Sequence, residues 1–204
     1  MSERPELLYK YSTVERTKEL LTESKIFFPS PADFNDPFDC RFHLTFKASS
    51  LKRRRYIREV LRKKRPDLPS KIRKNMAKHA NTAMFEKAPE RLMARVNRTA
   101  MLCLSARRES VLMWSHYAAK HSGICLEFRQ LALQIPGVPR IVPFPVTYSD
   151  DYPVIDFFEV EPFIGGSDDI AIAKQKEMVE RIYLTKAKDW QYEHEWARDR
   201  LDAF

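Results

Sequence analysis

The hydrophobic pattern is clearest between residues 101 and 128, where two short apolar runs enclose an amphipathic segment. The runs at 101–105 and 123–128 have the length and composition of strands buried on at least one face. A helix is predicted between them, and Ser110 is a suitable N-cap for it. The residues predicted to face the core from this helix are Val111, Trp114 and Ala118. We therefore expect a strand–helix–strand unit at the centre of the fold.

The segments before this unit predict a strand, a helix and a second strand. Residues 7–11 are aromatic and apolar, and the polar residues 12–15 then fit a capping box that opens a helix over 14–24. Residues 26–28 are predicted to form the second strand, which Pro29 ends. The turn-rich loop 32–39 follows, where Asp36 and Asp39 are candidates for holding a ligand or for purely structural hydrogen bonds.

The segments after the central unit predict an edge strand, a helix and a final strand. Three prolines between 139 and 145 limit the run at 140–148 to a sheet edge. Beyond a flexible-looking linker at 165–167, a helix is predicted to about residue 183, with inward side chains at Ile172, Val179 and Ile182. A strand over 186–196 would place Tyr192, His194 and Trp196 on one face and Glu193 and Glu195 on the other.

Positive charge is concentrated in one part of the chain. The net charge is +8, yet residues 52–98 contain 17 Lys and Arg against 4 Asp and Glu, a local balance of +13. Helices are predicted over 51–65 and from Ser70 to about residue 85, with a third beginning at Pro89. We interpret 51–98 as a basic helical insert that binds nucleic acid through Arg53, Arg54, Arg55 and Arg58, or else as a well-solvated helical surface.

The composition is that of one globular domain spanning residues 1–204. Hydrophobic residues make up 44% of the chain and only 4 residues are glycine, which disfavours both disorder and a glycine-rich phosphate loop. The three cysteines form no C-x-x-C pair, and no apolar run is long enough to span a membrane. We expect a cytoplasmic protein without a membrane segment. The ending at 198–204 suggests a truncated or unusually short C-terminus.

Four ordered motifs resemble the bacterial family called domain of unknown function 2971. They are Phe-Asn-Asp-Pro-Phe-Asp at 34–39, Met-Trp-Ser-His-Tyr-Ala at 113–118, Gly-Ile-Cys-Leu-Glu-Phe at 123–128 and Trp-Gln-Tyr-Glu-His-Glu at 190–195. The resemblance extends from Tyr9 to Trp196. The family label implies no activity.

A broader resemblance, to ADP-ribosyltransferases of the DNA-targeting toxin type, is carried by the order of the strand and helix motifs. It implies an α+β fold with a split pair of small β-sheets, flanking helices and the basic insert. In that superfamily the first strand supplies a His or Arg, the second a Ser or Tyr, and the last a glutamate. The matching residues are Lys10 between two tyrosines, Ser105 and Glu195, so lysine replaces the usual His or Arg.

The resemblance implies NAD as the substrate and assigns roles to particular residues. Glu195 would stabilise the positive charge that develops on the ribose, and Glu193 would orient or deprotonate the acceptor. Arg107 would bind the pyrophosphate, and Trp114 or Tyr117 would stack on nicotinamide. The full set of expected NAD-binding residues is Tyr9, Lys10, Tyr11, Ser105, Arg107, Trp114, His116 and Tyr117.

Simpler interpretations stay open for the same residues. In these interpretations the glutamates pair with Arg107 or Arg108 and Trp114 belongs to the core. A helical histidine such as His116 is more often structural than catalytic. The expected function is ADP-ribose transfer to a nucleic acid or a nucleic-acid-bound target in a toxin or phage-defence system, with an antitoxin or immunity protein as a candidate partner. The alternatives are a non-catalytic nucleic-acid-binding module and a metal-dependent nuclease.

Overall fold

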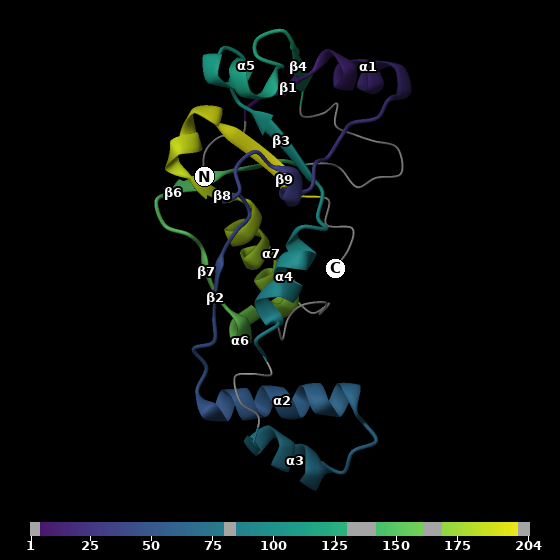
Figure 1. Cartoon of the computed structure of the whole chain (residues 1–204), viewed down its shortest axis with the longest axis vertical. Coiled ribbons are helices and arrows are strands. Elements are labelled where there is room, and N and C mark those ends of the chain that lie inside the picture. The colour runs from purple at the N-terminus through teal and green to yellow at the C-terminus, as the bar shows by residue number, and fades with distance from the viewer. Residues whose placement is uncertain (1–4, 80–84, 130–141, 161–168, 200–204) are drawn as a thin grey trace.

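A computed structural model of the chain describes residues 5–79, 85–129, 142–160 and 169–199, and its elements lie along an elongated molecule (Figure 1). The α-helices are α1 (Val14–Glu23), α2 (Ser50–Lys64), α3 (Ser70–His79), α4 (Ala88–Val96), α5 (Val111–Tyr117), α6 (Phe157–Val160) and α7 (Asp169–Tyr183). The strands are β1 (Leu7–Ser12), β2 (His43–Thr45), β3 (Met101–Ser105), β4 (Ile124–Arg129), β5 (Phe144–Pro145), β6 (Thr147–Ser149), β7 (Val154–Asp156), β8 (Thr185–Ala187) and β9 (Glu195–Asp199). The described residues also include the 3-10 helices η1 (Pro31–Asp33) and η5 (Lys188–Glu193).

Five strands form the main sheet, in the order β4-β1-β3-β9-β5, and every neighbouring pair in it is antiparallel. Two smaller parallel sheets pair β2 with β7 and β6 with β8. Helices α1 and α5 lie at the end of the molecule that holds β1 and β4, while α2 and α3 lie at the opposite end (Figure 1). The architecture is therefore α+β with several small sheets, and the predicted linker at 165–167 lies outside the described residues.

The central strand–helix–strand unit forms as its pattern predicts. Strands β3 and β4 enclose α5, and the Ser110 hydroxyl caps the helix by accepting from the Met113 amide at 3.4 Å. The predicted inward face is wrong in part, because the side chain of Val111 is 70% exposed whereas Met113 is buried. Helix α5 is only seven residues long, and it turns its Met113 side toward Tyr11 on β1.

A close backbone contact joins the end of α5 to β1. Three successive residues, Ala119, Lys120 and His121, have positive φ angles of 45°, 53° and 69°, which turns the chain back toward the sheet. Gly123 then passes so near β1 that a Cβ atom would lie 2.3 Å from the carbonyl oxygen of Ser12. Glycine is required at this position by the space available.

Two predicted strands are wrong. Residues 26–28 pair with no strand, although Ile26 and Phe28 still pack on the apolar cluster around Leu8 and Leu102. The segment 186–196 is not one strand but contains part of β8, the 3-10 helix η5 and the start of β9. His194, with a φ angle of 44°, lies between η5 and β9. The alternation of apolar and polar residues in this segment is compatible with a 3-10 helix as well as with a strand. Periodicity alone therefore does not distinguish the two.

The core divides into groups along the long axis. The largest joins α7, α4 and the main sheet through side chains that include Met178, Ile182, Val96 and Met101. A separate group, rich in aromatic residues, joins α2 and α3 to α6, with Ile57, Ala77, Phe85 and Phe158 buried in it. Within the basic segment, α4 thus packs against the main core, while α2 and α3 have their own.

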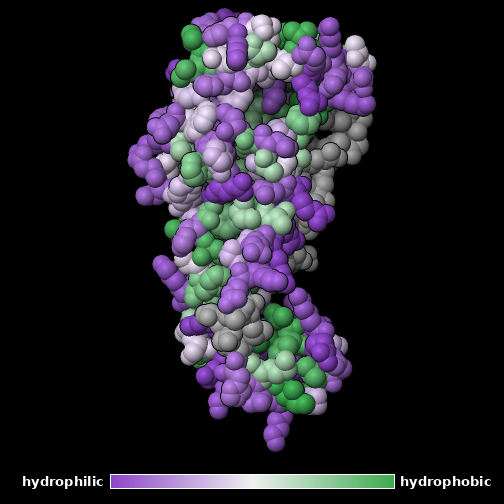
Figure 2. All heavy atoms as spheres, viewed as in Figure 1, coloured by the Kyte–Doolittle hydropathy of each residue, from purple (hydrophilic) through white to green (hydrophobic). Residues whose placement is uncertain are grey.

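The surface shown in Figure 2 is largely hydrophilic, with apolar side chains gathered at the end formed by α2 and α3. Exposed apolar residues there include Leu51, Ile72 and Met76. None of the described helices combines the length and apolar composition needed to cross a membrane.

Helix α7 provides a direct test of the core assignment. Ile182 is 1% exposed, whereas Ile172, which was predicted to face inward, is 55% exposed. We expect Ile182→Ala to lower the free energy of unfolding by about 2–5 kcal/mol, because it leaves a cavity in the main core. Ile172→Ala is the matched control and should change it by no more than about 0.5 kcal/mol. Urea denaturation measures both, and similar losses in the two variants would contradict this orientation of α7.

Candidate functional site

The predicted site residues converge on a cavity of about 300 Å³ at one end of β1, β3 and β9. Its wall also includes parts of α5, β8, η5 and the loop before β2. The predicted residues that line the cavity are Tyr9, Lys10, Tyr11, Ser105, His116, Tyr117, Glu193 and Glu195. These residues lie far apart in sequence and come together only in the folded chain.

Strand register accounts for this convergence. Tyr9 on β1 is paired with Ser105 on β3, and Ser105 is paired with Glu195 on β9. Directly paired residues of antiparallel strands project from the same face of a sheet. The three side chains therefore form one row across three adjacent strands, next to the cavity.

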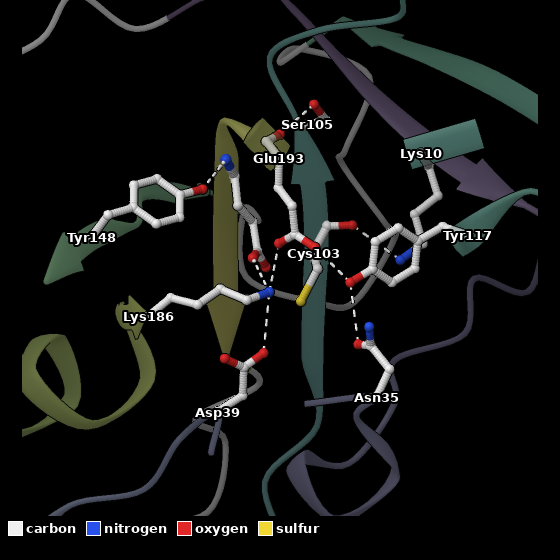
Figure 3. A network of polar contacts seen from close by, with 10 residues as sticks. Lys10, Asn35, Asp39, Cys103, Ser105, Tyr117, Tyr148, Lys186 and Glu193 are labelled. Atoms are coloured by element: carbon white, nitrogen blue, oxygen red, sulfur yellow. Dashed lines mark hydrogen bonds and ion pairs between the residues drawn. The ribbon is translucent and has the colours of Figure 1, made fainter. Parts of the chain in front are cut away.

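The centre of the site is a buried lysine between three carboxylates (Figure 3). The Lys186 Nζ lies 3.1 Å from Asp39 Oδ2, 2.5 Å from Glu193 Oε2 and 3.1 Å from Glu195 Oε2. No side chain of the four is more than 9% exposed. The alternative interpretation, in which the glutamates pair with Arg107 or Arg108, is wrong, because Lys186 is their partner.

Glu193 is held by both its backbone and its side chain. The Ser105 hydroxyl donates to the Glu193 carbonyl at 2.6 Å, and the Tyr117 hydroxyl lies 2.5 Å from Glu193 Oε1. The same Tyr117 hydroxyl lies 3.1 Å from Asn35 Oδ1 (Figure 3). Although Glu193 is in a 3-10 helix and not on the predicted strand, these bonds bring its carboxylate beside that of Glu195.

Asp39 comes from the turn-rich loop before β2. Asp36 shapes this loop by accepting from the Phe38 amide at 2.9 Å, as its turn composition predicts. The chain then passes through Cys40 with φ 56°. One oxygen of Asp39 bonds Lys186, and among the described residues the other, Oδ1, has no hydrogen-bond partner.

The carboxyl groups differ in their tendency to ionise. Burial raises the pKa of Glu193 to about 7, and the neighbouring Glu195 adds to this effect. Burial likewise raises the pKa of Asp39 to about 6. Burial also opposes ionisation of Glu195, but the Lys186 ammonium and hydrogen bonds from Cys103 and Lys186 outweigh it and lower its pKa. Near neutral pH, Glu195 is therefore ionised, whereas Glu193 is present in both its protonated and its ionised form.

Lysine and tyrosine in the site keep their protons. Burial acts against the charge of Lys186, but Glu195, Glu193 and Asp39 together raise its pKa above the usual value. Burial and then the nearby Glu193 carboxylate raise the pKa of Tyr117. The cation and the phenol are consequently hydrogen-bond donors at all physiological pH values.

Other predicted residues have structural roles. The Trp114 indole nitrogen donates to the Arg108 carbonyl at 3.1 Å, and its ring packs edge-on against Tyr11 at 5.4 Å. Trp114 and Arg107 do not line the cavity, so the structure does not bring them to the predicted stacking and pyrophosphate positions. Lys10 does line it, and its ammonium donates to the Cys103 carbonyl at 3.0 Å.

The described residues contain no group of three or more His, Cys, Asp and Glu side chains arranged to hold a metal ion. Sequence reasoning missed Lys186 and did not assign a partner to Asp39. No motif links Asp39 to Lys186, because 147 positions separate them. Helical and strand periodicities relate only residues that are close in sequence. Only the tertiary fold places them together.

Comparison with known families bears on the same region. A family model described as a protein of unknown function (DUF2971) matches residues 113–197, which include three of the four motifs found in the sequence. The match supports the resemblance to that family. No curated protein and no solved structure matches the chain.

Removal of the Glu193 charge should change how stability depends on pH. A carboxyl whose pKa is higher in the folded state binds more protons there, so its contribution to stability falls as pH rises from the unfolded to the folded pKa. For Glu193 this window runs from 4.5 to about 7. Relative to Glu193→Gln, the free energy of unfolding of the wild type should fall by on the order of a few kcal/mol across this pH window and stay constant above it. Urea denaturation at stepped pH measures this difference, and a constant difference from pH 4.5 to 7 would contradict the raised pKa.

Proposed function

We propose that the chain is an ADP-ribosyltransferase-like enzyme that transfers ADP-ribose from NAD to a nucleic acid or a nucleic-acid-bound target in a toxin or phage-defence role. The row formed by Tyr9, Ser105 and Glu195 carries this proposal. The transferase resemblance requires the first strand, a second strand with Ser, and a last strand with Glu to supply one site. Here these strands are adjacent. Tyr9, the neighbour of the matching residue Lys10, is in register with Ser105, and Ser105 is in register with Glu195. Lys10 lines the same cavity.

The charge state of Glu195 suits the breaking of the glycosidic bond. When the bond between ribose C1′ and the nicotinamide nitrogen breaks, nicotinamide leaves with the electron pair and positive charge develops on the ribose. A buried carboxylate beside this centre stabilises that charge more than it would in water. Glu195 is both buried and ionised, and it lines the cavity.

Glu193 suits the second half of the reaction. A nucleophilic nitrogen or oxygen of the acceptor forms a new bond to C1′ and must lose a proton. A general base works best when its pKa lies near the working pH, and burial raises that of Glu193 to about 7. Tyr117 holds this carboxylate in place at 2.5 Å, and in the proposed reaction Glu193 accepts the proton of the acceptor.

The remaining wall of the cavity is compatible with part of a dinucleotide. Its volume of about 300 Å³ is at the small end of the range for ligand pockets, so it would enclose one end of NAD. His116 and Tyr117 supply aromatic surface, and Lys10 supplies positive charge where the resemblance implies His or Arg. In the proposed complex the nicotinamide end occupies the cavity.

A second candidate, a non-catalytic nucleic-acid-binding module, is favoured by the surface of α2. Arg54 and Arg55 are exposed and Arg53 and Arg58 partly so. The helix lies at the end of the molecule opposite the main sheet (Figure 1). This surface would serve the transferase as well, because a nucleic-acid target could bind it while only the acceptor group enters the cavity.

Replacement of Glu195 tests the catalytic proposal. Glu195→Gln keeps the size of the side chain and removes its charge, so nicotinamide release should fall on the order of a hundredfold or more, with NAD affinity little changed. Glu193→Gln should impair transfer to the acceptor more than hydrolysis of NAD, because water needs less orientation. Glu127→Gln, on the exposed edge strand β4 of the same sheet, is the matched control and should release nicotinamide at the wild-type rate. Equal release by wild type and Glu195→Gln would remove the assigned role, and no release by the wild type with any acceptor would favour the binding module.

Salt dependence tests the surface of α2. If about five charges of the basic segment contact phosphates, the logarithm of affinity for single strands should fall with the logarithm of salt concentration at a slope of about −3.5. Replacement of Arg53, Arg54, Arg55 and Arg58 with Gln should flatten this slope. A control variant with the same change in net charge replaces Lys18, Lys25, Lys174 and Lys176, which lie on or next to α1 and on α7. Fluorescence anisotropy measures both, and equal slopes would show that α2 is not the binding surface.

A further inference from the structure

Lys186 has a role that neither the motifs nor the proposed reaction assigns. We propose that Lys186 is the positioning residue that holds Glu195 ionised and fixes Glu193 beside it, and that Asp39 holds Lys186 in place. The proposal deepens the transferase function and rests on it for the activity measurements, although the ion pairs can be tested without any activity.

The geometry of the ammonium leaves it no spare bonding capacity. A lysine ammonium has three N–H donors and no acceptor. Lys186 lies within 3.1 Å of one oxygen from each of three carboxylates, so every donor has a partner. Lys186 therefore serves the protein's own carboxylates and is not available to bind a phosphate of the substrate.

The three carboxylates come from three different structural elements, and Lys186 is their common contact. Asp39 lies in the loop before β2, Glu193 ends the 3-10 helix η5, and Glu195 begins β9. Lys186 itself lies on β8, whose pairing with β6 fixes its backbone. The ammonium also lies 5.1 Å from the centre of the Trp190 ring, within the range of a cation–π interaction.

The balance of charge explains why the lysine matters for the two glutamates. One ammonium faces three carboxylates, so the fully ionised cluster carries an excess of two negative charges in a buried place. Protons must relieve this excess, and Asp39 and Glu193 are the groups with raised pKa values. Without Lys186, the Glu195 carboxylate would face only like charges, and its own pKa should rise.

The thiols and phenols packed around the cluster are neutral at physiological pH, and the charged Lys10 ammonium in the same cavity bonds the Cys103 carbonyl and neither glutamate. Burial raises the pKa of Cys103 and of Tyr148, and the Tyr148 hydroxyl accepts from the Glu195 amide at 2.8 Å. Burial also raises the pKa of Cys40 and of the partly buried Tyr117. Lys186 is therefore the only full positive charge in direct contact with the two glutamates among the described residues.

Carboxyl titration tests the proposal directly. In protein labelled with ¹³C at the glutamate carboxyls, Glu195 and Glu193 are assigned from the signals lost in their Gln variants. We expect Lys186→Met, which has a similar length without charge, to raise the pKa of Glu195 by at least about one unit. Lys186→Arg keeps the charge and should return it toward the wild-type value. An unchanged Glu195 pKa in folded Lys186→Met would overturn the proposal.

A second variant keeps the proposal testable if Lys186→Met does not fold. Asp39→Asn removes one carboxylate at nearly constant shape and leaves the lysine in place. The remaining carboxylates then share Lys186 with one fewer competitor, so the pKa of Glu193 should fall toward its usual value. No change in the Glu193 titration in this variant would also overturn the proposal.

The activity profile gives the functional readout. In Lys186→Met, the acidic limb of the pH profile of nicotinamide release should move to higher pH, and in Lys186→Arg it should return toward the wild-type position. A purely structural role would instead lower the rate of release equally at every pH. If the wild type releases no nicotinamide, the proposed function fails while the carboxyl titrations still decide the role of Lys186. If the wild type is active and the titrations do not move, the role of Lys186 fails alone.

Discussion

The buried ammonium of Lys186 imposes the strongest constraint on this fold, because a charge removed from water must be neutralised within the protein. The isolated ion would be very costly to bury, and here three carboxylates within 3.1 Å offset that cost. These partners fix the loop before β2, the 3-10 helix η5 and the start of β9 against one another. The position of η5 in turn places Glu193 where Ser105 and Tyr117 can bond it. Loss of Lys186 would leave its three carboxylates without their common counter-charge, so the site is held as a unit.

The order of strands explains why this unit forms from both ends of the chain. Strand β1 comes from the first residues and β9 from the last described ones, yet they flank the same strand, β3. The row of Tyr9, Ser105 and Glu195 cannot exist until β9 has docked between β3 and β5. The site is thus a consequence of long-range antiparallel pairing, whereas α5 and β4 follow from local sequence. Such non-local assembly makes the cavity depend on completion of the whole main sheet.

Local signals in the sequence were sufficient for elements whose ends are set by their own residues. Ser110 and the buried run at 101–105 predict α5 and β3 because capping and apolar clustering act over a few positions. Periodicity failed where packing decides the outcome, as for the 3-10 helix η5, whose alternating residues were predicted to be a strand. The cavity-lining glutamates were predicted through an ordered motif, but Lys186 was not. Its partner Asp39 is distant in sequence, and no local pattern predicts that a single lysine on a short strand is buried.

The distribution of charge divides the proposed reaction between two parts of the molecule. Carboxylates outnumber the ammonium in the cluster, so this part of the cavity favours positive charge, which NAD carries on its nicotinamide ring and gains at C1′ as that ring departs. Phosphates would be repelled there, and nucleic acid would be repelled along its whole backbone. The arginines of α2 have the opposite preference and lie at the other end of the molecule (Figure 1). In the proposed reaction, a nucleic-acid target held by α2 would therefore extend along the molecule and present only its acceptor atom to Glu193. This proposal favours an extended strand or an exposed end as the target.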